Sequence, residues 1–181
     1  MKAIILAIAI PVCPSLAYAK PIPRFSDFGV HESFPKKSAQ PKLISARARL
    51  FRTMIKDQTK SGPNFAGHYT IASWGCGSMS CTSFAIVNNI TGDVYLPFGA
   101  FSVYVSSIDQ AEPTVDYRRN SQLLIVVGTM ALEKGQDRIG KQYYVWEKNR
   151  LRLIRFIPDR RFSKGVSGRG AIQQTLGADS P

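Results

Sequence analysis

The sequence predicts an α+β fold, in which one N-terminal amphipathic helix is followed by a mostly antiparallel, curled β-sheet of about six or seven strands. Three observations predict it. Apolar residues recur with a helical period between residues 43 and 60. Short runs of β-branched and aromatic residues, separated by turn residues, fill most of the remaining chain. The length of 181 residues, with 44% hydrophobic residues, suits one globular domain and not two full cores.

Residues 1–19 have the layout of a Sec signal peptide. Lys2 supplies a positive charge, an apolar stretch follows, and the small residues Ala17 and Ala19 precede a cleavage site before Lys20. The apolar stretch holds about ten residues, whereas a membrane-spanning helix needs about 20. We therefore expect a periplasmic or secreted protein with no transmembrane segment after cleavage. Removing residues 1–19 takes away one basic residue, which leaves 23 basic and 12 acidic residues and a net charge of +11.

Two segments precede the predicted sheet. Residues 20–42 are rich in Pro, Ser and Lys and predict an extended leader. Residues 43–60 predict the helix, with Ser45 placed to cap its start and the Ser-Gly-Pro sequence at 61–63 placed to end it. Its apolar face is formed by residues at helical spacing: Ile44, Ala48, Phe51 and Ile55. Three aromatic residues of the leader are candidates for contact with the body of the protein: Phe25, Phe28 and Phe34.

The rest of the domain, which we place at residues 43–162, predicts strands. We expect them at residues 69–74, 83–88, 93–96, 101–106, 122–128, 141–148 and 151–157, with Thr91-Gly92 and Asn149-Arg150 as turns. The continuous apolar run in residues 122–128 is typical of a central strand. Residues 163–181 are rich in glycine and poor in large apolar side chains, which predicts a flexible C-terminal tail.

Cysteine usage agrees with export. Cys13 is removed with the signal peptide, so Cys76 and Cys81 are the only cysteines of the mature chain. In an oxidising compartment we expect them to form a disulfide. The bond would close a loop of four residues between two strands, and we interpret it first as a structural staple. A functional loop is the alternative, because its glycines could turn backbone N–H groups toward an anion.

The segment around these cysteines contains three short motifs. It reads Asn-Phe-Ala-Gly-His-Tyr at 64–69, Trp-Gly-Cys-Gly at 74–77 followed by Cys81, and Thr-Gly-Asp-Val-Tyr at 91–95. This succession resembles that of a group of small exported proteins of Gram-negative bacteria for which no activity is established. The likeness extends over residues 43–95. It implies a single exported domain with the disulfide, and it implies no catalytic residues.

No enzyme signature stands out. Asn64 and His68 form a candidate polar site, and a hydrolase or redox protein using residues 64–81 is therefore kept as an alternative function. Both histidines, His31 and His68, precede the cysteines, whereas a papain-type nucleophile is followed by its histidine. Four residues separate the cysteines, and thioredoxin-type redox motifs have two. We find no metal-ligand spacing and no cofactor motif, so no metal or cofactor is expected.

Basic residues favour a non-enzymatic binding or envelope-associated function. One group lies in the last predicted strand and comprises Arg150, Arg152 and Arg155, and a second group follows the exposed side of the helix and includes Arg49, Arg52 and Lys56. A basic face of this kind suits anionic ligands, because the planar guanidinium group bonds both oxygens of a carboxylate or phosphate. Outside the cytoplasm, such ligands include lipopolysaccharide phosphates, peptidoglycan carboxylates and acidic proteins. Nucleic acid is not expected there.

A second binding hypothesis comes from the tail. Ser167, Gly168, Arg169 and Gly170 resemble the Ser-Gly-Arg loop by which some periplasmic lysozyme inhibitors fill an active site. Inhibition of a lysozyme-type hydrolase is therefore a further alternative. The strong positive charge of the chain argues against it, because lysozymes are usually basic as well.

Overall fold

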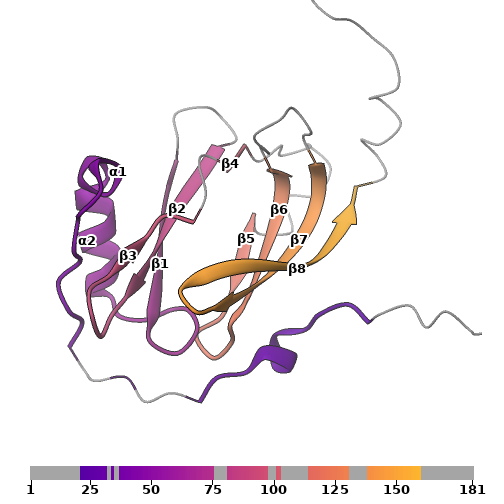
Figure 1. The fold of residues 1–181 in the computed structure, drawn as a ribbon, viewed down its shortest axis with the longest axis horizontal. Coiled ribbons are helices and arrows are strands. Elements are labelled where there is room, and N and C mark those ends of the chain that lie inside the picture. Colours follow the sequence, from indigo (N-terminus) through magenta and orange to yellow (C-terminus); the bar gives the residue numbers. More distant parts are fainter. Residues whose placement is uncertain are drawn as a thin grey trace, which may run out of the picture.

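The computed structural model of this chain describes residues 21–31, 34, 37–75, 81–97, 101–102, 114–130 and 138–159. The elements follow in chain order: the 3₁₀ helix η1 (Phe25–Phe28), helices α1 (Ala46–Leu50) and α2 (Arg52–Lys60), and strands β1 (Tyr69–Gly75), β2 (Cys81–Asn88), β3 (Val94–Tyr95), β4 (Phe101–Ser102), β5 (Val115–Tyr117), β6 (Leu123–Met130), β7 (Arg138–Glu147) and β8 (Arg150–Pro158). Helices α1 and α2 lie on one side of a β-structure, and a leader segment runs below it in the view of Figure 1.

The single predicted helix is replaced by two helical segments. Ser45 caps α1 as expected, because its hydroxyl accepts a hydrogen bond from the Ala48 N–H at 3.1 Å. The helical path is interrupted at Phe51, whose ring stacks on that of Trp74 with 4.4 Å between centroids. α2 then ends at Lys60, before the predicted stop. The helical period thus locates the region correctly, but the expectation of one continuous helix is wrong.

The strands form two antiparallel blocks, so the expected single sheet of six or seven strands is not confirmed. The first block contains β1, β2 and β3, and the second contains β5, β6, β7 and β8. The two-residue strand β4 pairs with both β2 and β6 and so links the blocks. In the pairing path of the described residues, β1 and β8 are the two ends and are not joined, so the structure is not a closed barrel. The coarser prediction of an α+β fold with antiparallel strands is confirmed.

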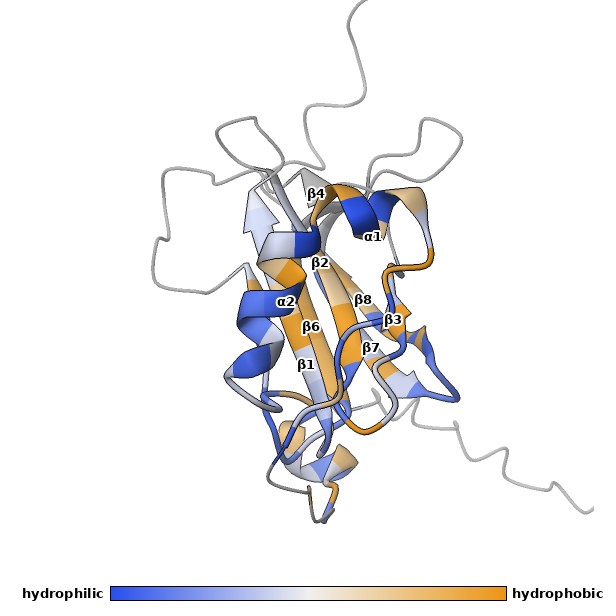
Figure 2. Cartoon of the chain, turned by 90° about the vertical axis from the view of Figure 1, so that its left-hand side faces the viewer, coloured by the Kyte–Doolittle hydropathy of each residue, from blue (hydrophilic) through white to orange (hydrophobic). Residues whose placement is uncertain are grey.

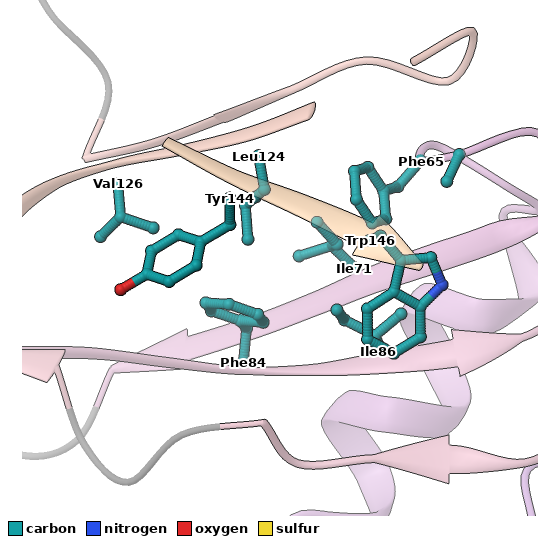
Figure 3. Packing of buried hydrophobic residues seen from close by; sticks show 9 residues of the cluster. Phe65, Ile71, Phe84, Ile86, Leu124, Val126, Tyr144 and Trp146 are labelled. Atoms are coloured by element: carbon teal, nitrogen blue, oxygen red, sulfur yellow. The ribbon is translucent and has the colours of Figure 1, made fainter. Parts of the chain in front are cut away.

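The main core lies between the inner faces of the two blocks. Because side chains alternate along a strand, every second residue points inward. Figure 3 shows Ile71, Phe84 and Ile86 from the first block pointing toward Leu124 and Tyr144 from the second. These side chains are at most 2% exposed. Burial of this apolar surface is the main term that holds the blocks together.

Two smaller apolar clusters lie on the outer faces. Ile55 of α2 packs with Trp74, Ala85 and Val87 on the outside of the first block. The opposite side of α2 is polar, as Figure 2 shows by its mostly blue colour. On the outside of the second block, the leader residues Phe25 and Phe28 pack on a cluster formed by Leu123, Tyr143 and Val145. Strand β6 therefore has buried side chains on both faces, as its continuous apolar run predicts.

The leader is fixed to the domain at this second cluster. The Ser121 hydroxyl lies 2.8 Å from the Phe25 carbonyl oxygen, and the Gln122 N–H donates to the Phe28 carbonyl at 2.9 Å. The guanidinium of Arg118 lies 4.3 Å from the centre of the Phe25 ring. Two of the three predicted leader contacts therefore exist, and the leader includes the short helix η1. No helix in the described part of the chain is long and apolar enough to cross a membrane.

Two further sequence predictions differ from the structure. The turn between β7 and β8 is formed by Lys148 and Asn149, one residue earlier than expected, and both residues have positive φ angles, of 50° and 59°. These angles match the tight two-residue turn that suits the twist of a hairpin. Strand β5 was not expected, because three residues are too few for an alternating pattern. The tail at 163–181 lies outside the described residues.

Candidate functional site

The three arginines of β8 lie on one face, and a β-bulge is the reason. Arg152 is paired with Val145 and Arg155 with Tyr143, while the pairing register shifts between Tyr143 and Tyr144. A regular strand would place Arg152 and Arg155 on opposite faces, because side chains that are three residues apart in a strand point to opposite sides of the sheet. The extra residue, Ile154, restores them to the same side. We call Arg150, Arg152 and Arg155 the β8 arginine face; it lies on the outside of the second block.

The arginines of this face have different partners. Arg152 donates from Nε and from its second terminal nitrogen to the two carboxylate oxygens of Glu147. This hydrogen bond lowers the pKa of Glu147, with further lowering by the nearby positive charges. Arg155 donates to the backbone oxygen of Pro21 in the leader at 3.1 Å. Among the described residues, exposed Arg150 forms no ion pair.

The basic residues of the helices form a separate strip. Arg49, Arg52 and Lys56 are all exposed, on helices that cover the outside of the first block. The helices cover the outside of the first block, whereas β8 belongs to the second block, and the main core lies between the two blocks (Figure 1). Arg49 also has a local role, because it donates to the backbone oxygens of Leu43 and Ile44 just before α1. The structure therefore does not bring the two predicted basic groups together into one surface.

Asn64 completes the edge of β1 instead of facing a cleft. Its side-chain oxygen accepts the Ile71 N–H at 2.8 Å, and its side-chain nitrogen donates to the Ile71 carbonyl at 3.1 Å. The amide thus pairs with Ile71 as a neighbouring strand would. Gln58 of α2 does the same for Ser73, with distances of 2.9 Å and 2.8 Å. Edge strands expose unpaired backbone groups, and these two amides cover those of β1.

His68 lies in the tight turn that leads into β1. Its N–H donates to the Ala66 carbonyl at 3.0 Å, its carbonyl accepts the Asn89 N–H at 2.9 Å, and its ring lies 4.3 Å from that of Tyr69. Ala66 has a φ angle of 43°, which the surrounding hydrogen bonds hold in place. The backbone of His68 therefore joins the first motif to the end of β2.

A buried polar contact joins the residue after the first motif to a residue just before the last motif. The Thr70 hydroxyl lies 2.8 Å from the Asn89 side-chain oxygen, and both residues are fully buried. In the last motif, Gly92 has a φ angle of 79°, and a Cβ atom there would overlap the carbonyl oxygen of Gln40. Asp93 follows, and Lys42 of the leader bonds its carboxylate at 2.9 Å. Local structure thus accounts for these positions of the last motif.

A cavity of about 220 Å³ opens into the main core. Its wall combines the apolar side chains of Ile71, Phe84 and Val115 with the polar residues Ser73, Thr82 and Tyr117. Burial raises the pKa of the Tyr117 phenol. Ligand pockets for small molecules usually measure about 300 to 1,000 Å³, and this cavity is smaller.

Several predicted site residues cannot be placed. Cys76 and residues 167–170 lie outside the described residues, and of Cys81 only the backbone in β2 is described. The disulfide and the inhibitor-like loop therefore stay predictions. Within the described ranges, no group of three His, Cys, Asp or Glu side chains is arranged to hold a metal ion.

Comparison with protein-family models, with curated proteins and with solved structures gave no match to this chain. Sequence reasoning missed Gln58 and Ile154. Ile154 had a visible signal, because Leu153 and Ile154 interrupt the alternation of β8 with two successive apolar residues.

Proposed function

We propose that this protein is an exported, non-enzymatic binding protein of the bacterial envelope, and that the β8 arginine face binds anionic ligands. The observation that carries the proposal is the bulge at Ile154. It gathers Arg150, Arg152 and Arg155 on one outer face, where regular alternation would have separated them. Several guanidinium groups on one face favour ligands with phosphate or carboxylate groups over cationic or neutral ligands, because each guanidinium group can bond two oxygens of an anion.

The charge balance around the turn supports this proposal. Lys148 lies in the turn, Arg150 follows it, and Glu147 is the acid that bonds Arg152. Because Glu147 is exposed at the surface, this ion pair is weak, and an incoming phosphate can compete for Arg152. The net charge of +11 adds long-range attraction for anions, which salt screens.

The placement of Asn64 argues against the alternative hydrolase or redox function. A catalytic amide or base must be able to contact substrate. Both polar atoms of the Asn64 side chain are bonded to the backbone of Ile71, which is 1% exposed. The polar site that motivated the enzyme hypothesis is therefore better explained as part of the edge of β1.

Localisation is part of the same proposal and has its own test. If residues 1–19 are a cleaved signal peptide, protein purified from the producing bacterium begins at Lys20 and lies in the periplasmic or extracellular fraction. N-terminal sequencing of that fraction is the measurement. A soluble cytoplasmic product that begins at Met1 would contradict it.

The binding test uses the mature chain with lipopolysaccharide vesicles and with purified peptidoglycan. We expect retention that falls as NaCl rises from about 50 to about 500 mM, because the attraction is screened. Simultaneous Arg150→Ala, Arg152→Ala and Arg155→Ala should weaken binding by about tenfold or more, since each substitution removes a charge-assisted hydrogen bond. The matched control removes three charges from the other side of the molecule: Arg52→Ala, Lys56→Ala and Lys60→Ala. Equal losses in the two triple variants, or retention that salt does not change, would contradict the proposal.

A further inference from the structure

The two end strands of the β-structure differ in how their outward backbone groups are satisfied. At β1, these groups are bonded by the side-chain amides of Asn64 and Gln58 and by the backbone of Phe65. An edge strand whose N–H and C=O groups are occupied does not accept another strand. The edge of β1 is therefore closed to partners.

At β8, the outward groups belong to Leu151 and Leu153. In a hairpin with a two-residue turn, the pair that flanks the turn is hydrogen-bonded, and the next pair points its groups away. Trp146, the residue opposite Leu151, indeed donates its backbone N–H to Gln122 at 2.9 Å and not to β8. In the described part of the chain, neither leucine has a backbone hydrogen bond outside the β7–β8 ladder, and Leu153 is 43% exposed.

The side chains of residues 150–153 specify what a neighbouring strand should carry. Arg150 and Arg152 lie on the outer face, and Leu151 and Leu153 lie on the inner face with their partners in β7. Opposite charges and apolar pairs stabilise neighbouring strands when they lie directly across from one another. A second copy of β8 would place arginine against arginine, which is unfavourable. The preferred neighbour has acidic residues on one face and apolar residues on the other.

We propose that β8 binds an extended segment of an acidic protein, in which acidic and apolar residues alternate, by adding it as an antiparallel strand along residues 150–153. This inference rests on the proposed function, because it names the partner class of the β8 arginine face. The backbone bonds of Leu151 and Leu153 supply the attachment, and the arginines supply the selectivity. The turn at one end and the bulge at Ile154 at the other limit the contact to a short segment.

The first test uses a capped peptide of alternating Glu and Val and two N-methylated forms of it. In the antiparallel arrangement, the Val residues lie opposite the leucines, and their N–H groups point toward β8. Methylation of the Val amides should therefore weaken binding by about tenfold or more, whereas methylation of the Glu amides should leave it within about twofold of the parent. Both forms keep the charge of the parent, so salt-dependent attraction alone predicts equal affinities. Equal affinities, whether high or low, would overturn the inference.

The second test changes the protein. Leu153→Pro removes an outward N–H that β7 does not use. We expect this variant to lose peptide binding while it keeps salt-sensitive retention on lipopolysaccharide. Arg150→Glu with Arg152→Glu should reverse the preference toward a peptide of alternating Lys and Val, and the control Arg52→Glu with Lys56→Glu should not. Retained peptide binding by Leu153→Pro, with unchanged preference after charge reversal, would overturn the inference.

The two proposals fail in different ways. If retention on lipopolysaccharide depends on the arginines but the two methylated peptides bind alike, the proposed function stands and the strand-addition inference is wrong. If the two methylated peptides differ in affinity, but retention on lipopolysaccharide and on peptidoglycan does not depend on the arginines, then the strand-addition inference stands and the proposed envelope ligands are wrong.

Discussion

The amide of Asn64 gives the sharpest test of the structural interpretation. Asn64→Ala removes both hydrogen bonds to Ile71 and leaves a buried N–H and a buried C=O without partners. Each unpaired buried group costs about 1 to 3 kcal/mol, so we expect a loss of about 3 kcal/mol in the free energy of unfolding. For a chain of this size, that loss lowers the melting temperature by about 6 to 12 °C. Urea unfolding followed by circular dichroism measures the first quantity, and calorimetry measures the second.

The near-isosteric variant Asn64→Asp separates lost hydrogen bonding from lost volume. At neutral pH the introduced carboxylate still accepts the Ile71 N–H, but its second oxygen faces the Ile71 carbonyl oxygen, which repels it. Burial and this repulsion raise the folded-state pKa of the carboxyl above its unfolded value of about 4. The stabilisation is therefore fully present below that unfolded pKa and is lost as pH rises through the folded pKa. We expect the deficit relative to wild type to be smallest near pH 4 and to grow toward pH 7.

Two outcomes would refute the reasoning. A stability loss below about 0.5 kcal/mol in Asn64→Ala is the size expected at ordinary surface sites, and it would mean that the amide does not complete the edge. A deficit in Asn64→Asp that does not change with pH would mean that the second oxygen does not face a carbonyl. Gln58→Ala is the comparator, and we expect a smaller loss because Ser73 is only partly buried. A catalytic Asn64 would give the opposite sign or no change in stability, because active-site residues often cost stability.

Three further predictions concern other positions. Gly92→Ala should lower the free energy of unfolding by more than about 1 kcal/mol in urea titration, because the positive φ and the carbonyl of Gln40 leave no room for a Cβ; wild-type stability would contradict the observed turn. Burial raises the pKa of Tyr144 to about 12, so absorbance at alkaline pH should show one phenol ionising near pH 12 that Tyr144→Phe removes. The stabilisation by the neutral phenol should be present below a pH of about 10 and lost as pH rises toward 12. Mass spectrometry of exported protein after alkylation without reductant should find Cys76 and Cys81 unmodified, and full alkylation would contradict the disulfide.

Local signals in the sequence predicted some of the elements and missed others, such as β5 and the break between α1 and α2. Ser45 caps α1, and the hydrophobic run of β6 lies between paired strands on both edges, as its composition indicates. What the sequence could not supply is the assignment of strands to two blocks. That division depends on which strand edges are covered by other parts of the chain, as Gln58 covers the edge of β1. Such contacts join residues from different elements, so the hydrophobic periodicity of a single segment does not predict them. The break at Phe51 has the same origin, because it accompanies stacking on Trp74 from another element.

The sequence predicted part of the β8 arginine face. Arg150 and Arg152 were placed on one face by simple alternation, which is correct before the bulge. Arg155 joins them only because Ile154 adds one residue to β8. Asn64 was selected for its chemistry alone, but a side-chain amide has the same donor and acceptor pair as a peptide bond and serves equally well as an edge partner. Residue type by itself does not distinguish these two uses.

The two end strands differ in how many of their polar groups are used within the fold. The motifs singled out in the sequence lie around β1, and several described polar side chains there are bonded to backbone or to each other: Asn64 to Ile71, Thr70 to Asn89, and Lys42 to Asp93. Side chains that are bonded in this way stabilise the fold and are not available to bind a ligand. At β8 the balance is reversed, since Leu151 and Leu153 direct backbone groups outward beside exposed arginines. A ligand binds to polar groups that have no partner within the protein. We therefore expect substitutions in β8 to change ligand binding and substitutions around β1 to change the free energy of unfolding.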